Sequence, residues 1–368
     1  MSNDAATVRP LLGMPAPRVA VVTGSYGAGP DAAARQLTRV LRDAGCEVEV
    51  HDIVTLLPFR LGPALRTLYY AQLRRNPDSW DTTLRLLEPG HRLHRVVTSL
   101  LKIAVAPVVR ATQGCDLVIT THPFGAQALG QARMTGRLSA PAVSYLTDTS
   151  VHSLWIHRGV DLNLAIHEVA AQEAERWGGP ATVVQPLVPP NIVYGAVPET
   201  TDPLAPYEIT GPRALITGGS LGVGDLERTA RDILATGVMT PVVLAGRDDR
   251  VRRRLDEIPG VVALGWRDDM PALLATSDCV IQNAGGFSAL EALASGSPVI
   301  SYRPLPGHGA ANSLNLERAG LIPWARTTDE LAELLTAATT ASRRDRLPTY
   351  APDVLDVLTG AAETAAAA

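Results

Sequence analysis

Residues 213–224 read RALITGGSLGVG and residues 18–29 read RVAVVTGSYGAG, so one pattern occurs twice in the chain. In each copy a run of strand-forming residues (213–217 and 18–23) leads into a glycine-rich turn. Apolar residues at helical spacing follow both turns. Strand, turn and helix in this order are typical of the first unit of a parallel α/β sheet. The repetition predicts two Rossmann-like domains.

Further strand-forming runs continue this alternation on either side of a proline-rich stretch. The other expected strands are 46–51, 116–120, 142–146, 162–166, 241–244, 261–264, 279–282 and 298–302. Residues 186–212 hold seven prolines and little periodicity, which is typical of a linker. The expected parts are a disordered N-terminus (1–16), a first lobe (17–190), a linker (191–212), a second lobe (213–340) and a C-terminal helix and tail (341–368).

Composition and charge exclude several classes of protein. The chain has 368 residues, 46% of them hydrophobic, which suits two folded domains and excludes a disordered protein. Its net charge of −4 argues against general nucleic-acid binding. We find no apolar run of about 20 residues and no signal peptide, so we expect a cytoplasmic protein. The isolated Cys46, Cys115 and Cys279 indicate neither disulfides nor zinc, and we expect them to be buried.

One segment departs from this balance of charge. Residues 58–110 carry nine basic and three acidic residues, with leucines and tyrosines between the arginines. The pattern favours a pair of interfacial helices on an anionic membrane surface. A solvated arginine-rich helix and a cover over the core of the first lobe are the alternatives. The candidate acceptor- or membrane-binding residues are Tyr26, Arg66, Tyr69, Arg74, Arg75, Arg92 and Arg95.

The glycine loops of the second half are candidates for binding a phosphate. Gly219–Gly224 opens a helix, where free backbone N–H groups and the helix dipole favour an anion, although any tight turn needs glycine. Residues 283–298 (NAGGFSALEALASGSP) repeat the arrangement. Glu291 there either binds ribose hydroxyls or forms a capping box with Ser288. His308 is a candidate contact of the phosphate or sugar, or an ordinary surface histidine.

Polar residues also follow two expected strands of the first half, in THPF (121–124) and TDTSVHSLWIH (147–157). Open α/β sheets bind ligands at the carboxyl ends of their strands. Asp148 alternatively caps a helix, and His152 alternatively packs beside Trp155. Metal binding has no support, because no HExxH-like spacing occurs. The candidate proton-transfer groups are His122, Asp148, His152 and His157.

With these pieces assembled, the chain resembles the monogalactosyldiacylglycerol synthase-like branch of glycosyltransferase family 28. It is similar, more distantly, to the N-acetylglucosaminyltransferase that forms lipid II. The likeness runs from about residue 18 to 335. The pieces that carry it are GSYGAG (24–29), THPF (121–124), TDTSVHSLWIHRGVD (147–161), GGSLGVG (218–224), LGWRDDMPALLATSD (264–278) and NAGGFSALEALASGSP (283–298).

The resemblance implies a GT-B fold, in which two Rossmann-like lobes face a cleft and are joined by the proline-rich linker. It implies inverting transfer of a hexose from a UDP-sugar, held by the second lobe, to a diacylglycerol-like lipid, held by the first. The enzyme would need no cofactor or metal and would lie peripherally on the inner face of the cell membrane. The donor-binding positions would be Gly219, Ser220, Gly222, Arg247, Trp266, Gly285, Gly286, Ser288, Glu291, His308 and Asn312.

Two departures from the family pattern bear on the chemistry. The resemblance implies a histidine in the first turn as the general base, and Pro30 occupies that position here. Asp31, His122 and Asp148 are the candidate substitutes, although Asp31 alternatively serves as a helix N-cap. Gly309 stands where the family often has an acidic residue in the donor-sugar loop. Three rivals stay open: a soluble natural-product glycosyltransferase, a UDP-sugar 2-epimerase and a non-catalytic relative.

Overall fold

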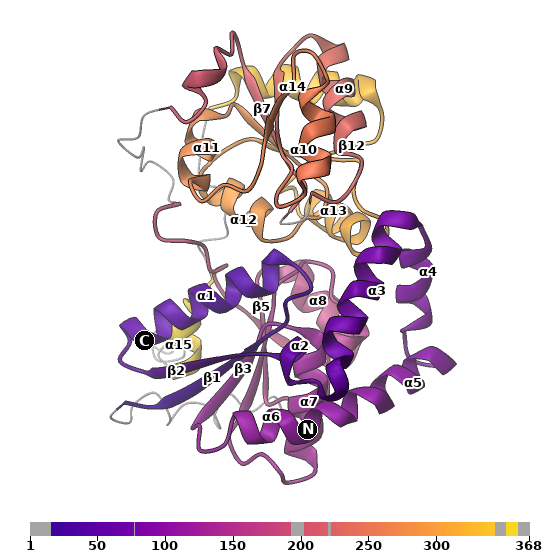
Figure 1. Cartoon of the computed structure of the whole chain (residues 1–368). Helices are drawn as coiled ribbons and strands as arrows, with labels where there is room; N and C mark the ends of the chain where they lie inside the picture. Colours follow the sequence, from indigo (N-terminus) through magenta and orange to yellow (C-terminus); the bar gives the residue numbers. More distant parts are fainter. Residues whose placement is uncertain (1–15, 77, 193–201, 220–221, 343–350, 360–368) are drawn as a thin grey trace. The chain divides into compact units, whose positions relative to one another are not determined.

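The computed structural model describes residues 16–76, 78–192, 202–219, 222–342 and 351–359. The chain divides into two units, Met1–Leu187 with Pro348–Ala368, and Val188–Leu347 (Figure 1). Residues 1–15 of the expected disordered N-terminus lie outside the described residues. The short helix α15 (Val354–Thr359) belongs to the first unit, where Gln185 Nε2 donates to Ala351 O over 2.8 Å. The C-terminal segment therefore packs with the first unit.

Six parallel strands form the sheet of the first unit, in the order β2-β1-β3-β4-β5-β6. The inner strands β3, β4 and β5 are buried along their whole length, as expected of a parallel sheet covered by helices on both faces. The strands are β1 (Arg18–Thr23), β2 (Glu47–Asp52), β3 (Leu117–Thr120), β4 (Ala142–Leu146), β5 (Leu162–Ala165) and β6 (Ala181–Val183).

Helices cover this sheet on both faces (Figure 1). α1 (Ala28–Asp43) packs on β1 and β2, and α8 (Glu168–Arg176) packs on β5 and β6. The face that presents Ala20 and Val22 of β1 is covered by α2 (Ile53–Leu56), α6 (Val105–Ala111) and α7 (Pro123–Met134). Side chains alternate between the faces of a strand, so each face has its own core.

Residues 58–110 form a run of short helices, not the expected helix pair. They are η2 (Pro58–Arg60), α3 (Leu61–Arg75), α4 (Asp78–Leu86), α5 (Arg92–Leu101), η3 (Lys102–Ala104) and α6. The end of the run covers the core of the unit, because Ala104, Val105 and Val108 are buried there. α3 and α5 leave large apolar side chains exposed. Among the described helices, none is both long and apolar enough to cross a bilayer.

The sheet of the second unit has six parallel strands in the order β12-β11-β10-β7-β8-β9. β7 lies near the middle, and the chain places later strands on both sides of it. The strands are β7 (Arg213–Thr217), β8 (Thr240–Leu244), β9 (Val262–Leu264), β10 (Cys279–Gln282), β11 (Val299–Tyr302) and β12 (Trp324–Ala325).

Two layers of helices enclose this second sheet. One face, with Ile216 and Ile281, packs against α9 (Leu226–Thr236), α10 (Asp249–Asp256) and α14 (Thr328–Thr340). The other face, with Leu215 and Val280, packs against α11 (Met270–Thr276), α12 (Phe287–Ala294) and α13 (His308–Arg318). Neighbouring residues of one strand thus serve different cores, which explains the uninterrupted apolar runs in the sequence.

All ten predicted strands are present, and their ends differ from the prediction by no more than one residue. The sequence did not predict β6 and β12, which have three and two residues and no distinctive pattern. The three cysteines are buried thiols, as expected.

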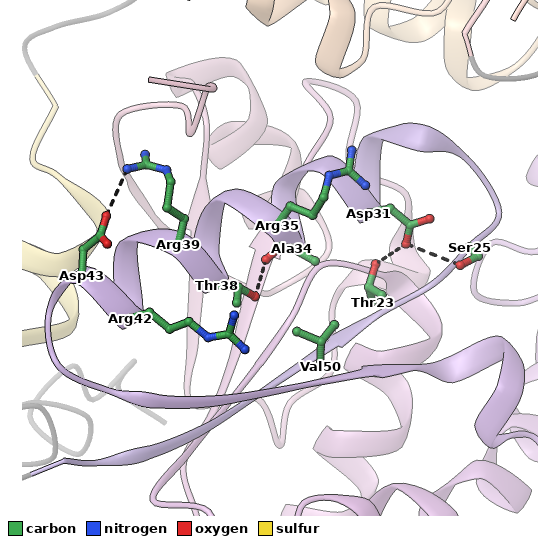
Figure 2. Close-up of a pocket in the computed structure, with 10 residues that line it drawn as sticks. All are labelled: Thr23, Ser25, Asp31, Ala34, Arg35, Thr38, Arg39, Arg42, Asp43 and Val50. Carbon is green, nitrogen blue, oxygen red and sulfur yellow. Dashed lines mark hydrogen bonds and ion pairs between the residues drawn. The ribbon is translucent and has the colours of Figure 1, made fainter. Parts of the chain in front are cut away.

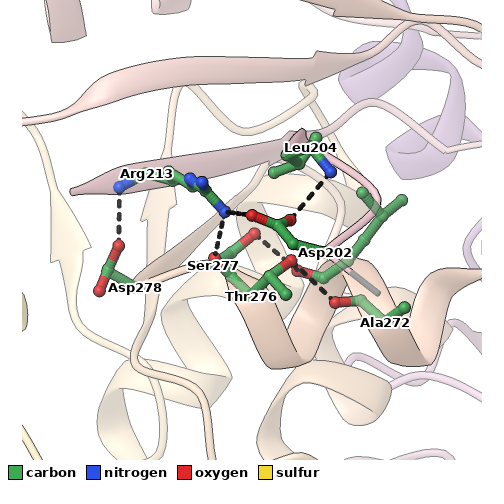
Figure 3. A network of polar contacts seen from close by, with 8 residues as sticks. Asp202, Leu204, Arg213, Ala272, Thr276, Ser277 and Asp278 are labelled. Atoms are coloured by element: carbon green, nitrogen blue, oxygen red, sulfur yellow. Dashed lines mark hydrogen bonds and ion pairs between the residues drawn. The ribbon is translucent and has the colours of Figure 1, made fainter. Parts of the chain in front are cut away.

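Residues 202–212, expected to be linker, belong to the second unit. Leu204 is fully buried in the core beneath α11. The carboxylate of Asp202 accepts hydrogen bonds from Arg213 Nη1 (2.7 Å) and Leu204 N (2.9 Å), as Figure 3 shows. Arg213 N in turn donates to Asp278 Oδ2 over 2.8 Å. The prolines suggested a linker, but an ion pair and one buried leucine dock the segment on β7; residues 193–201 lie outside the described residues.

Candidate active site

Each sheet has one pair of neighbouring strands at which its order reverses. These pairs are β1 and β3 in the first sheet, and β7 and β10 in the second. Loops that leave such a pair diverge, and open α/β sheets bind ligands in the crevice between them. All four loops carry motifs that the sequence predicted to be functional. The described parts of these loops lie at residues 24–27, 121–122, 218–219 with 222–225, and 283–286.

Three loops of the second unit are joined at the carboxyl edge of its sheet. They follow β7, β10 and β11, which are adjacent strands. Asn283 Nδ2 donates to Val223 O over 2.8 Å, which joins the first loop to the second. Leu305 N donates to Asn283 O over 2.7 Å, which joins the third. Asn312 is completely buried, and its Nδ2 donates to Ala284 O over 2.9 Å.

Glycine is required at two positions in these loops. Gly222 has a φ of 57°, and a Cβ there would lie 2.4 Å from Ala245 O. Gly285 has a φ of 69°, and its Cβ would lie 2.6 Å from Asn312 Cβ. Gly219 also has a positive φ, and Gly286 is the N-cap of α12. Ser220 lies outside the described residues.

The capping box, one of the two interpretations of Glu291, is not formed. α12 begins at Phe287 with Gly286 as its N-cap, so Ser288 is already the second residue of the helix. The backbone enters the helix two residues earlier than the box would require. Ser288 and Glu291 are both half-buried, and His308 is half-buried as the first residue of α13.

Arg247 and Trp266 lie together in the loops that follow β8 and β9. The Arg247 guanidinium carbon is 4.3 Å from the centroid of the Trp266 ring, a cation–π contact. The Trp266 side chain remains 44% exposed, and its Nε1 donates to Asp268 Oδ1 over 2.9 Å. The arginine therefore supports a large aromatic surface that stays accessible.

In the first unit, His122 is a buried structural side chain. Its Nδ1 accepts a hydrogen bond from Phe124 N at the start of α7 (3.2 Å), so Nε2 carries the proton of the neutral ring. The ring of Tyr26 stacks on it, with centroids 5.2 Å apart. A Cβ at Gly24 would lie 2.4 Å from His122 Cγ, so the turn after β1 needs glycine here. Burial lowers the pKa of His122 to about 3, and the ring has no free acceptor for a substrate proton.

An aromatic cluster continues from His122 towards α3 and α4. Tyr69 contacts the ring of Tyr26 edge-on at 5.8 Å and that of Trp80 at 4.9 Å. Burial raises the pKa of Tyr26, against the opposing charge of Arg66, so its hydroxyl is neutral. Of the other predicted acceptor residues, Arg75, Arg92 and Arg95 are exposed and Arg66 is half-buried. Arg74 lies in α3, and its side chain lies outside what the structure describes.

Asp31 lines a groove of about 570 Å³ beside α1 and β2 (Figure 2). It is not the N-cap of α1, which is Gly27, so that alternative is wrong. Its Oδ1 accepts hydrogen bonds from Thr23 Oγ1 (2.9 Å) and Ser25 Oγ (3.5 Å). Within the described residues its other oxygen has no hydrogen-bond partner. Figure 2 also shows Arg35 on the same helix face, a lining residue that the sequence did not single out.

Asp148 follows β4 and is half-buried, and Thr147 Oγ1 lies 3.5 Å from its Oδ2. It does not cap the next helix, η4 (Ser153–Trp155), because His152 does so by accepting from Leu154 N. His157 Nδ1 accepts from Gly159 N in the same way, and burial lowers the pKa of both histidines.

No three His, Cys, Asp or Glu side chains gather closely enough in the described ranges to hold a metal ion.

Comparison with known proteins agrees with the motifs. The family model described as monogalactosyldiacylglycerol (MGDG) synthase matches residues 31–190. The processive diacylglycerol beta-glucosyltransferase of Bacillus cereus (strain 03BB102) is 25% identical over 349 residues, covering 86% of this chain and 84% of the relative. That of Bacillus mycoides (strain KBAB4) is 24% identical over 353 residues, with the same coverage. The predicted resemblance is confirmed, and so is the prediction of a glycosyltransferase.

Solved structures show the fold. The complex of Anabaena Alr3699/HepE with UDP and glucose has a TM-score of 0.55 at 17% identity, covering 95% of this chain and 99% of that one. MurG of Acinetobacter baumannii has a TM-score of 0.55 at 15% identity, covering 96% and 100%. With its two parallel six-stranded sheets, the chain has the GT-B fold that the sequence predicted.

We expect acid to destabilise the first unit in part through His122. Its folded-state pKa of about 3 lies below the ordinary value of 6.5. Between these two pH values the unfolded chain therefore binds a proton at His122 and the folded chain does not. The stabilisation is complete above about pH 6.5 and is lost as the pH falls towards 3. Urea unfolding at pH 7 to 4 should show this as a slope of up to about 1.4 kcal/mol per pH unit. His122→Asn, which keeps an N-cap acceptor, should reduce the slope; an unchanged slope would contradict the assignment.

Proposed function

We propose that this chain transfers a hexose from a UDP-sugar to a diacylglycerol-like lipid, with inversion at the anomeric carbon. The observation that carries the proposal is the joining of three glycine loops around Asn283, at the carboxyl edge of the second sheet. Such an edge offers backbone N–H groups and helix N-termini to a diphosphate. Support comes from relatives named as diacylglycerol glucosyltransferases and from a structural neighbour that holds UDP and glucose.

In this proposal the second unit binds the donor. The loops at Gly219–Gly222 and Gly285–Gly286 receive the diphosphate, and Glu291 binds the ribose hydroxyls. Trp266, supported by Arg247, offers its exposed ring to the nucleobase. His308, at the start of α13, faces the phosphate or sugar, whereas buried Asn312 holds the loop in place. UDP leaves with its charge stabilised by backbone N–H groups and helix dipoles, without a required metal.

The acceptor hydroxyl attacks the anomeric carbon, the bond to UDP breaks, and the hydroxyl proton passes to a base of the first unit. We assign this role to Asp31. Thr23 and Ser25 hold one of its carboxylate oxygens, and the residue lines a groove that an acceptor can enter. His122 is unsuited because its ring is buried and its acceptor nitrogen is already bonded. Asp148 is the remaining candidate.

The acceptor is supplied from a membrane surface, on the inner face of the cell membrane, by α3, α5 and the turn before α3. Leu61, Leu65 and Leu68 recur at helical spacing on α3 and are exposed, as are Leu93, Val96 and Leu100 on α5. Phe59 is 89% exposed, and both it and Arg60 have left-handed backbones. Exposed arginines beside apolar side chains suit anionic headgroups.

Titration calorimetry with UDP tests the donor site. We expect binding of UDP, and an affinity about tenfold lower in Glu291→Gln, because a charge-assisted hydrogen bond to the ribose is lost. The natural protein should bind deoxy-UDP, which lacks a ribose hydroxyl, more weakly than UDP. Glu291→Gln should bind the two ligands with similar affinity, because its contact to the ribose is already weakened. Glu317→Gln, on α13 and ion-paired with Arg326, is the matched control. No binding at millimolar UDP would reject the donor site.

If Asp31 is the base, its replacement should lower activity, whereas replacement of Asp43 in the same groove should not. Asp31→Asn should lower kcat by about 10² to 10⁴-fold while UDP affinity stays unchanged. Asp43→Asn, which lies in the same groove paired with Arg39, should keep nearly full activity. Steady-state kinetics with a diacylglycerol acceptor and mass-spectrometric product detection would measure both. Retained activity in Asp31→Asn together with its loss in Asp148→Asn would move the base to Asp148.

Vesicle co-sedimentation tests the membrane surface. Leu68→Ser and Val96→Ser should each lower the partition coefficient on phosphatidylglycerol-containing vesicles by about tenfold, because each removes apolar area from the bilayer interface. Val50→Ser is the matched control, because Val50 is 49% exposed and Val96 54%, but Val50 lies on β2. Failure of the natural protein to bind anionic vesicles would favour a soluble natural-product glycosyltransferase.

A further inference from the structure

Asn283 is the contact point of the three donor loops, and no motif gives it a role. Its side-chain amide donates to Val223 O over 2.8 Å, and its backbone carbonyl accepts from Leu305 N over 2.7 Å. The residue is only 6% exposed. It therefore links the loop after β7 and the loop after β11 to its own loop, although the three lie far apart in the sequence.

The neighbouring loops approach Asn283 closely at two glycines, Gly224 and Gly309. A Cβ at Gly224 would lie 2.3 Å from Asn283 Nδ2, and a Cβ at Gly309 would lie 2.9 Å from Asn283 O. Both distances are shorter than real Cβ atoms show. A side chain at Gly309 would push its loop away from the Asn283 backbone, and one at Gly224 would displace the Asn283 amide. Gly309 is the position where the resembling family often has an acidic residue. Here the close approach of α13 to Asn283 explains the glycine.

The other half of the amide indicates that Asn283 is not kept for stability alone. Its Oδ1 is buried, and the described residues provide no hydrogen-bond partner for it. A buried acceptor without a partner lowers the stability of the fold, whereas an apolar side chain of similar size would not. Asn163 of β5 has the same unpartnered Oδ1, so the place of Asn283 between three loops, and not this atom alone, points to a role in the site.

We infer that Asn283 is the positioning residue of the donor site, and this inference rests on the proposed function. Its side-chain amide sets the spacing between the glycine loop after β7 and the N-terminus of α12, while its backbone carbonyl holds the loop before α13. Backbone N–H groups from separate loops then converge on one diphosphate before the ligand arrives. Such preorganisation raises affinity because the ligand does not have to order the loops. The Asn283 side chain acts through Val223 and does not itself contact the phosphates.

The first test compares two buried asparagines by calorimetry with UDP. Asn163 of β5 is the matched control, because it is 3% exposed, its Nδ2 donates to Pro180 O over 3.2 Å, and its Oδ1 also has no partner in the described part of the chain. Asn283→Ala and Asn163→Ala should lower the melting temperature to a similar extent. UDP affinity should fall about tenfold in Asn283→Ala and less than twofold in Asn163→Ala.

The second test uses the hydrogen bond itself. In Asn283→Asp the introduced carboxyl group is buried, so it is protonated at low pH and can donate to Val223 O, but when ionised it cannot. The ratio of its UDP affinity to that of the natural protein should therefore be near one at pH 5 and fall several-fold by pH 8. Taking the ratio at each pH removes the titration of UDP.

The outcomes separate the inference from the proposed function. Unchanged UDP affinity in Asn283→Ala, an equal loss in Asn163→Ala, or a pH-independent ratio in Asn283→Asp would overturn the inference while UDP binding by the natural protein still supports the function. A natural protein that does not bind UDP would overturn both. The predicted pattern in all three variants would establish Asn283 as the residue that holds the donor loops in place.

Discussion

The close approach of loops that leave adjacent parallel strands is the constraint on which the rest of this structure depends. Parallel strands end at the same edge, so their loops compete for one small volume. In the second unit the loops can approach closely because Gly222, Gly285 and Gly309 have no side chains. The side-chain amide of Asn283 then joins two of the loops by a hydrogen bond. The result is an edge built from main-chain groups, which suits an anion because backbone N–H groups need no reorganisation to face it.

The first unit meets the same constraint with a different result. There the crevice between β1 and β3 is filled by the ring of His122, which Gly24 accommodates and Tyr26 covers. Filling the space with an imidazole removes that imidazole from acid–base chemistry, since burial and an N-cap hydrogen bond keep it neutral. His122 therefore does not replace the histidine that the resembling family has at the position of Pro30. A carboxylate on the groove side of α1 is the better placed group.

The sequence predicted the sheets well and the contacts between loops poorly. Strands such as β7 and β10 are apolar runs buried on both faces, a local property that one chain displays directly. The spacing of Ser288 and Glu291 alone suggests a capping box, but α12 begins at Phe287, so Ser288 is not at the N-cap position. Asn283 could not have been found, because its partner Val223 lies 60 positions away. Seven prolines over 186–212 predict a linker, and no local pattern shows that Leu204 is buried or that Asp202 pairs with Arg213.

Left-handed backbone occurs outside glycine in both units, at Phe59 and Arg60 of the first and at Arg303 of the second. Arg303, the first residue after β11, has a φ of 46°, and its guanidinium is paired with Asp232 at 2.7 Å, so a contact inside the unit offsets the strain. Phe59 and Arg60 have φ values of 57° and 58°, yet Phe59 is 89% exposed and Arg60 is exposed as well. Left-handed backbone costs about 1 kcal/mol or more at each such residue. The proposed membrane surface would account for a strained turn that presents an aromatic ring to solvent, because a lipid interface would bury the ring.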